Sequence, residues 1–152
     1  MATAEHPPTI AVDAMGSDQG PAEVLQGVAA FIREAEDHEL SSCHFCVIGR
    51  GPDLEEGLDQ AGLRDHPRLT VVHAEEVIGM DEKPLQSIKR KRDSSMVRAL
   101  SMVREGNADA LLSCGNTGSL MAGGTLMVRP LEGVDRPALA TIIPTRSSRF
   151  IL

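Results

Sequence analysis

The sequence predicts an α/β fold, a three-layer α/β/α sandwich built on a mainly parallel sheet. Short apolar runs rich in β-branched residues alternate along the chain with longer segments whose apolar residues recur at helical spacing. The runs are apolar throughout, which is typical of strands that helices cover on both faces of a sheet. Proline and glycine stand where several of the periodic segments should begin or end.

The first half of the chain contains two strand-and-helix units and a third strand. Pro21 follows a glycine-containing loop and favours the first turn of a helix. Gly62 follows the second periodic segment, as expected of a residue that ends a helix. The expected elements are strands over residues 9–13, 44–49 and 69–73 and helices over about 21–36 and 53–61.

The second half opens with residues 74–92, which lack a clean period and are expected to form an ordered excursion or a short helix. Residues 150–152 look like a strand that is just beginning, so we expect the sequence to be part of a larger protein. The other expected elements are helices over about 94–105 and 119–128, a strand over 108–113 and a fifth strand around 139–143.

Composition excludes several classes of protein. The chain has 152 residues, 41% of them hydrophobic and 24% charged, as in one soluble globular domain. Its formal net charge of -7 disfavours nucleic acid and anionic membranes, and its 2% of aromatic residues argues against stacking on bases. The sequence carries no apolar stretch of about 20 residues and no signal-peptide pattern, and its three cysteines fit a reducing compartment. We therefore expect a cytoplasmic protein.

Two loops are expected where parallel strands end and helices begin, the usual place for ligands in open α/β sheets. They are "DAMGSDQG" at residues 13–20 and "SCGNTGS" at residues 113–119. Gly115 and Gly118 allow close approach of the backbone to a ligand, and Asn116 and Thr117 add polar side chains. Neither loop has the P-loop or the dinucleotide pattern, so a phosphate or oxyanion site and an ordinary turn both stay open.

Three other features allow both a structural and a functional interpretation. Asp13 and Asp18 fit either helix capping or a site. The cations of "KRKRDSSM", residues 89–96, precede a helix, where they would form an anion site, meet an acidic protein or simply face solvent. "CHFC", residues 43–46, lacks the second ligand pair of a zinc site, so we expect buried cysteines and no metal.

Four blocks together resemble the PlsX family, the phosphate acyltransferases of bacterial phospholipid synthesis. The blocks are "AVDAMGSD", "KRKRDSSM", "SCGNTGSLM" and "PLEGVDRPALATIIPT", and the resemblance runs from about residue 10 to residue 145. It implies the fold of isocitrate and isopropylmalate dehydrogenases and of phosphotransacetylases. It also implies a homodimer that works near the membrane and contacts it peripherally. Residues 1–8 are then a flexible N-terminus, and residues 9–152 form the N-terminal portion of a phosphate acyltransferase domain that is truncated at its C-terminus.

The resemblance implies transfer of a fatty acyl group from acyl carrier protein to inorganic phosphate, which yields acyl phosphate, without a cofactor. Phosphate is the nucleophile, so the protein must hold two partners together and stabilise a developing oxyanion. Two alternatives remain: a phosphotransacetylase-like enzyme that uses acyl-coenzyme A, and a non-catalytic module that binds phosphate or the carrier protein. The family's next block, an Asp-x-Gly-Ala-Asn loop, is missing here, so we assign the activity to the parent enzyme.

The resemblance also implies roles for particular residues. Asn116 and Lys91 are the expected catalytic residues, and residues 115–118 should bind phosphate or the oxyanion. Lys89 and Arg90 are expected to dock the acidic carrier protein. Cys114 stands where the family commonly has alanine. The further residues expected to bind substrate or phosphate are Asp13, Gly16, Asp18, Arg92, Ser94, Ser95, Gly115, Thr117 and Gly118.

Overall fold

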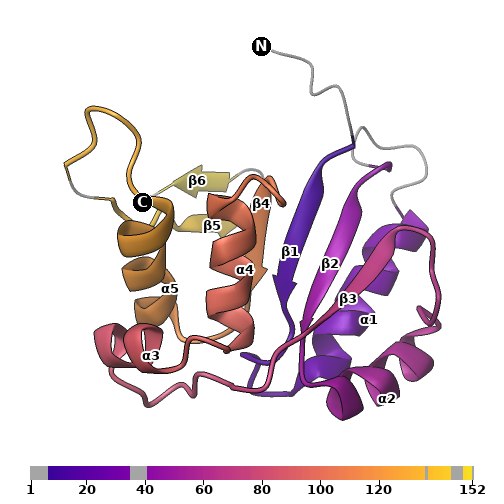
Figure 1. Cartoon of the computed structure of the whole chain (residues 1–152). Coiled ribbons are helices and arrows are strands. Elements are labelled where there is room, and N and C mark those ends of the chain that lie inside the picture. Colours follow the sequence, from indigo (N-terminus) through magenta and orange to yellow (C-terminus); the bar gives the residue numbers. More distant parts are fainter. Residues whose placement is uncertain (1–6, 35–40, 136, 145–148, 152) are drawn as a thin grey trace.

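A computed structural model describes residues 7–34, 41–135, 137–144 and 149–151 of the chain (Figure 1). Its main feature is a four-stranded parallel sheet in the order β3-β2-β1-β4. The strands are β1 (Thr9–Asp13), β2 (His44–Gly49), β3 (Leu69–His73) and β4 (Ala110–Ser113). The prediction of an α/β fold with a parallel sheet is therefore confirmed.

Helices connect these strands, because parallel strands cannot be joined by a tight turn. Figure 1 shows α4 in front of the sheet and α1 behind it. The helices are α1 (Pro21–Glu34), α2 (Gly51–Ala61), α3 (Pro84–Arg90), α4 (Ser95–Arg104) and α5 (Thr117–Gly123), and α5 continues into the π-helical turn η1 (Gly124–Val128).

The core has two halves, one on each face of the sheet. On the first face, Val12 of β1 packs with Leu25 of α1 and Leu54 of α2, and all three are fully buried. On the second face, Ala11 of β1 packs with Ala99 of α4. Side chains that alternate along a strand point to opposite faces, so one apolar strand serves both halves. Each fully buried leucine contributes about 1.5–3 kcal/mol by leaving water.

Most predicted elements in the first half are confirmed at their predicted bounds. Three strands coincide with the predicted ranges, and α1 begins at Pro21 as expected. Gly62 ends α2 with a φ of 68°, in the left-handed region that favours glycine. The predicted end of the first helix, near residue 36, and residues 1–6 of the expected N-terminal segment lie outside the described residues.

The second half differs in detail. The excursion at residues 74–92 contains the short helix α3, as one of the two expectations had it. The fourth strand begins at Ala110 and not at residue 108, because Asn107 and Ala108 donate their N–H groups to the end of α4. The helix predicted over residues 119–128 begins at Thr117 and changes to π-helical winding at Gly124.

The fifth strand predicted around residues 139–143 is present as β5 (Ile142–Pro144), and the strand predicted over 150–152 is present as β6 (Arg149–Ile151). The two pair with each other in a separate antiparallel sheet, because so short a connection permits only antiparallel pairing. The prediction that helices cover the main sheet on both faces is wrong in part. Val71 on β3 and Leu112 on β4 are each 46% exposed, because the packed helices centre on β1 and β2.

Within the described residues, each helix is too short or too polar to cross a bilayer.

We expect Ser94→Ala to lower the free energy of unfolding by about 1 kcal/mol, because Ser94 caps α4. Its hydroxyl oxygen accepts the Val97 N–H at 3.4 Å and donates to the Lys91 carbonyl at 2.8 Å. Urea denaturation of the variant provides the measurement. Ser101→Ala, within the same helix, is the matched control, and an equal loss in both variants would contradict the capping role.

Candidate functional site

Two glycine turns leave neighbouring strands at the carboxyl edge of the sheet and touch each other. β1 and β4 pair in a register that places Asp13 opposite Ser113. Beyond this pair, a Cβ atom placed on Gly16 would lie 2.5 Å from Gly115 Cα and 2.8 Å from Gly115 N. A side chain at residue 16 would therefore push the turns apart. The structure brings together the two loops that the sequence predicts as one site.

Hydrogen bonds of Asp13 join the two turns. Asp13 is only 1% exposed, and its Oδ2 accepts the Ser113 hydroxyl at 2.8 Å. Its Oδ1 accepts the Met15 N–H at 3.3 Å, and the Ser113 oxygen accepts the Gly115 N–H at 3.1 Å. The carboxylate therefore holds backbone from both turns. Asp13 was predicted either to cap a helix or to belong to the site, and the structure shows its carboxylate at the junction of the two predicted loops.

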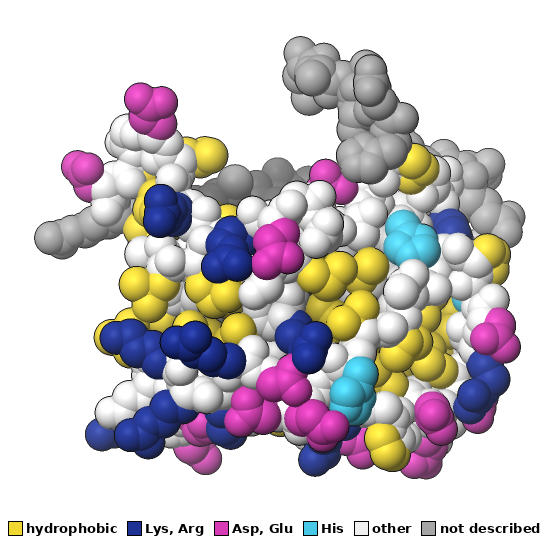
Figure 2. Space-filling model, in the orientation of Figure 1, with side chains coloured by type: hydrophobic (Ala, Val, Ile, Leu, Met, Phe, Trp, Pro, Cys, Tyr) yellow, Lys and Arg dark blue, Asp and Glu magenta, His cyan; other side chains and the backbone are white. Residues whose placement is uncertain are grey.

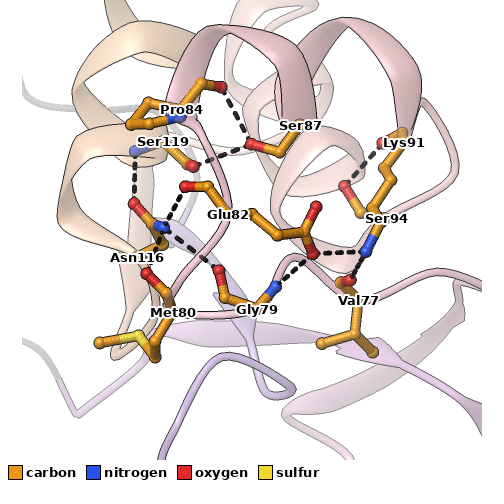
Figure 3. Close-up of polar contacts among 10 residues, drawn as sticks. All are labelled: Val77, Gly79, Met80, Glu82, Pro84, Ser87, Lys91, Ser94, Asn116 and Ser119. Atoms are coloured by element: carbon orange, nitrogen blue, oxygen red, sulfur yellow. Dashed lines mark hydrogen bonds and ion pairs between the residues drawn. The ribbon is translucent and has the colours of Figure 1, made fainter.

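Asn116 clamps the second turn to the loop before α3 (Figure 3). It caps α5, and its Oδ1 accepts the Ser119 N–H at 2.9 Å. Its side-chain NH₂ group donates to the carbonyl oxygens of Gly79, Met80 and Glu82 at 3.2, 2.9 and 3.1 Å. Both ends of this buried amide thus have protein partners, and the loop at residues 77–83 is tied to the glycine turn.

Lys91 fixes the same loop from its other side. Its Nζ donates to Glu82 Oε1 at 2.5 Å and to the Val77 carbonyl at 2.6 Å. Glu82 Oε1 also accepts the Gly79 N–H at 2.7 Å. The hydrogen bond from Lys91, together with that from Gly79, lowers the pKa of Glu82 below its ordinary value. Glu82 is therefore ionised at neutral pH, and the ion pair with Lys91 stays intact.

A pair of buried serines joins α3 to α5. The oxygens of Ser87 and Ser119 lie 3.0 Å apart, and the Ser87 hydroxyl donates to the Pro84 carbonyl at 2.9 Å (Figure 3). Since the Ser87 proton is used in this way, Ser119 donates to Ser87. Together with the Asn116 clamp, this pair makes the glycine turn, the loop at residues 77–83 and two helices one connected unit.

The remaining predicted residues divide into exposed and buried ones. Thr117, Gly118, Asp18 and Arg92 are exposed. Ser94 is fully buried as the cap of α4, and Ser95 is 2% exposed, so the structure does not bring their side chains to the surface of the glycine turns. Thr117 and Gly118 begin α5, where N–H groups have no partner within the helix. These two residues offer donors to an anion.

Several important residues were not predicted. Glu82, Ser113 and the pair Ser87 and Ser119 hold the site together, yet sequence reasoning did not select them. The signal for Ser113 was available, because the register of two parallel strands that both end in polar residues places it beside Asp13. The segment around Glu82 has no period, so its contact with Lys91 could not be read from spacing.

The cysteines behave largely as predicted. Cys43 and Cys46 are buried, and burial raises the pKa of both thiols. Cys114 is exposed at the second glycine turn. Within the part of the chain that the structure describes, His, Cys, Asp and Glu side chains form no group of three that could hold a metal ion. The turns present backbone amides, hydroxyl groups and the Cys114 thiol.

Comparison with known proteins identifies the family to which this chain belongs. Residues 8–152 match the family described as "Fatty acid synthesis protein". A phosphate acyltransferase of Alcanivorax borkumensis is 44% identical over 137 residues, which are 90% of this chain and 39% of the relative. Phosphate acyltransferases of Bacillus licheniformis and Pseudomonas savastanoi are also 44% identical, over 91% and 92% of this chain. The chain spans about two fifths of the length of these curated relatives.

We expect Glu82→Gln to abolish a pH-dependent change in the loop at residues 77–83. Because the folded pKa of Glu82 is lowered, its ion pair stabilises the loop above the ordinary glutamate pKa of about 4.3, and this contribution is lost as pH falls through the lower folded value. The Gly79 amide resonance, followed by NMR during acid titration, measures the change. A titration of this amide that is the same in Glu82→Gln as in wild type would exclude Glu82 as its source.

Proposed function

Because the chain belongs to the fatty acid synthesis protein family, we propose that the full-length protein transfers a fatty acyl group from acyl carrier protein to inorganic phosphate. The relatives named phosphate acyltransferase support transfer to phosphate, and the PlsX resemblance supports acyl carrier protein as donor. The observation that carries the proposal is the contact between two glycine turns at the carboxyl edge of a parallel sheet. The products are acyl phosphate and the free carrier-protein thiol.

The reaction requires positioning more than a protein nucleophile. A phosphate oxygen attacks the thioester carbonyl carbon, the C–O bond forms, and the C–S bond then breaks with the electron pair leaving on sulfur. Holding both reactants in line contributes up to about 7–11 kcal/mol, and one well-placed oxyanion donor contributes about 2.7–4 kcal/mol. The exposed N–H groups at the start of α5 are our candidates for such donors.

Asn116 and Lys91 fit a positioning role in this reaction. Their polar atoms are engaged by the loop at residues 77–83, so we propose that they act by fixing that loop against the glycine turn. Asp13 and Gly16 would fix the opposite turn in the same way. The exposed first turn of α5 would bind the phosphate, and Arg92, which lines a groove with Ile88 and Lys89, would receive the carrier protein. Ser94 and Ser95 would support this wall from within the core.

Further properties of the whole protein belong to the same proposal. We infer the isocitrate dehydrogenase-like fold, with the described sheet as its N-terminal portion, a homodimer, a cytoplasmic location and a peripheral contact with the membrane. A second candidate function follows from the length comparison. The chain spans 39–40% of three of its relatives, so we propose as the alternative that its 152 residues alone bind phosphate or the carrier protein without turnover.

An assay of acyl phosphate, trapped with hydroxylamine, tests the proposal. The full-length protein receives inorganic phosphate with either acyl-[acyl carrier protein] or acyl-coenzyme A, and the 152-residue chain is assayed beside it. We expect phosphate-dependent product from the carrier-protein donor. A preference for coenzyme A indicates the phosphotransacetylase type of enzyme, and phosphate-induced stabilisation without product indicates a binding module.

We expect Asn116→Ala to lower acyl-phosphate formation at least tenfold in the full-length protein, because four hydrogen bonds that position the glycine turn are lost. The kcat and kcat/KM of purified enzyme give the measurement, with circular dichroism as the check on folding. Thr125→Ala, which removes an exposed hydroxyl bonded within its own helix, is the control. Wild-type turnover by a folded Asn116→Ala protein would remove this assignment.

We expect the double variant Lys89→Glu and Arg90→Glu to raise the KM for the acidic carrier protein with little change in kcat. Figure 2 shows Lys and Arg side chains gathered over α3 and α4, at the lower left of this view. Lys89 also lines a groove of about 340 Å³ together with Ile88 and Arg92. The effect should shrink as ionic strength rises, since salt screens exposed charges.

Arg33→Glu is the matched control for this charge reversal, because Arg33 is an exposed cation at the end of α1, behind the sheet in Figure 1. A KM that is unchanged in the double variant, or raised equally by Arg33→Glu, would count against docking over α3.

A further inference from the structure

An apolar groove of about 480 Å³ lies between α1 and β4. This volume is within the range of about 300–1,000 Å³ that is common for small-molecule sites. Its walls are the face of α1 that bears Val24, Val28 and Phe31 and the exposed face of Leu112 on β4. The groove exists because α1 packs over β1 and β2 and leaves the same face of β4 uncovered.

One end of the groove is formed by the glycine turns themselves. Ser17 of the first turn and Cys114 of the second both line it. They are the chain neighbours of Gly16 and Gly115, whose backbones touch. From this end the groove follows α1 from Val24 to Phe31, which is about 10 Å at the helical rise per residue. The candidate reaction site therefore opens directly into an apolar channel.

The lining indicates a neutral, apolar occupant. Apart from Glu23, the residues of the described chain that line the groove are uncharged, and Glu23 stands in the first turn of α1, near the glycine turns. An anion placed deep in the groove would lose hydration without gaining a charged partner. A hydrocarbon chain would instead exchange water for Val28, Phe31 and Leu112 and gain free energy with each methylene buried.

We propose that this groove binds the acyl chain of the substrate, with the thioester carbonyl at the glycine turns and the tail directed toward Phe31. The inference rests on the proposed function and adds to it a location for the tail. Ser17 and Cys114 mark the boundary between the polar and the apolar part of the substrate. The competing occupant is another part of the full-length protein, since the relatives are more than twice as long as this chain.

Gly27 provides the test, because it lines the groove and a Cβ placed on it would meet nothing within 4 Å. We expect Gly27→Phe to fill the groove without disturbing the fold. In the full-length protein, kcat/KM for octanoyl transfer should fall about tenfold or more relative to butyryl transfer, because the octanoyl chain extends past residue 27, the butyryl chain does not, and each displaced methylene is worth about fourfold in affinity. Gln26→Phe, which adds the same side chain at the neighbouring exposed position of α1 outside the groove, is the matched control and should leave the ratio of the two chain lengths unchanged.

Each other outcome has a distinct meaning. If Gly27→Phe leaves the ratio of kcat/KM for the two chain lengths unchanged, the groove proposal is overturned. Formation of acyl phosphate by the same protein would still support the proposed function. Equal loss for both chain lengths together with a lowered Tm shows that another part of the protein fills the groove, which also overturns the proposal. If even the wild-type protein forms no acyl phosphate, the proposed function is wrong. A binding measurement then tests whether the groove takes an acyl chain.

That measurement uses Cys114, the exposed one of the three cysteines, as a reporter. The rate of its alkylation by iodoacetamide is followed with octanoyl-coenzyme A or butyryl-coenzyme A present. We expect stronger protection by the octanoyl compound, and a smaller difference between the two in Gly27→Phe. Equal protection by both compounds would overturn the proposal, because the polar part of the ligand alone would then cover the thiol.

Discussion

The contact between Gly16 and Gly115 is the constraint on which the site depends. A Cβ on Gly115 would lie 3.0 Å from Gly16 Cα and 3.3 Å from Met96 Cε, so this turn also fits between the first turn and α4. The contact continues the parallel pairing of β1 with β4, whose last pair is Asp13 and Ser113. A larger residue at either glycine would separate the turns and stretch the hydrogen bond between Asp13 and Ser113. The geometry of the site thus depends on the register of β1 and β4 and on the buried carboxylate of Asp13.

The polar side chains around this contact form hydrogen bonds to other parts of the protein, and so they position the backbone of the site. Asn116 bonds to backbone 34 to 37 residues away, and Lys91 closes the same loop through Glu82. Leaving the buried Asn116 amide without its partners would cost about 1–3 kcal/mol, so this side chain favours one conformation of the loop. A rigid frame of this kind has its donors in place before a charge develops, which is what electrostatic stabilisation of a transition state requires. Among the described residues of the second turn, the backbone amides of Thr117 and Gly118 at the start of α5 are the candidates to bind an anion.

The sequence predicted the elements that depend on local pattern and missed those that depend on distant partners. β-branched runs located three strands at their bounds, and Gly62 located the end of α2, because backbone preference decides both. The pairing of β5 with β6 and the contact of Glu82 with Lys91 depend on how segments meet in space. The residues of the two glycine turns were selected correctly as neighbours, since parallel strands end at one edge. The sequence could not predict that Asn116 binds protein backbone, because its partners lie in a distant loop.

The strand order determines both the contact between the glycine turns and the position of the uncovered face of β4. An acyl thioester has a polar end that requires fixed donors and a hydrocarbon end that requires a dry apolar surface. β1 lies at the centre of the sheet, so the turn after it meets the turn after β4, while α1, which also follows β1, forms the wall beside β4. Ser17 and Cys114 therefore lie where the polar glycine turns meet the apolar groove. On the proposed function, a change that moved α1 over β4 would bury Leu112 and stabilise the sheet, yet it would close the space beside the turns.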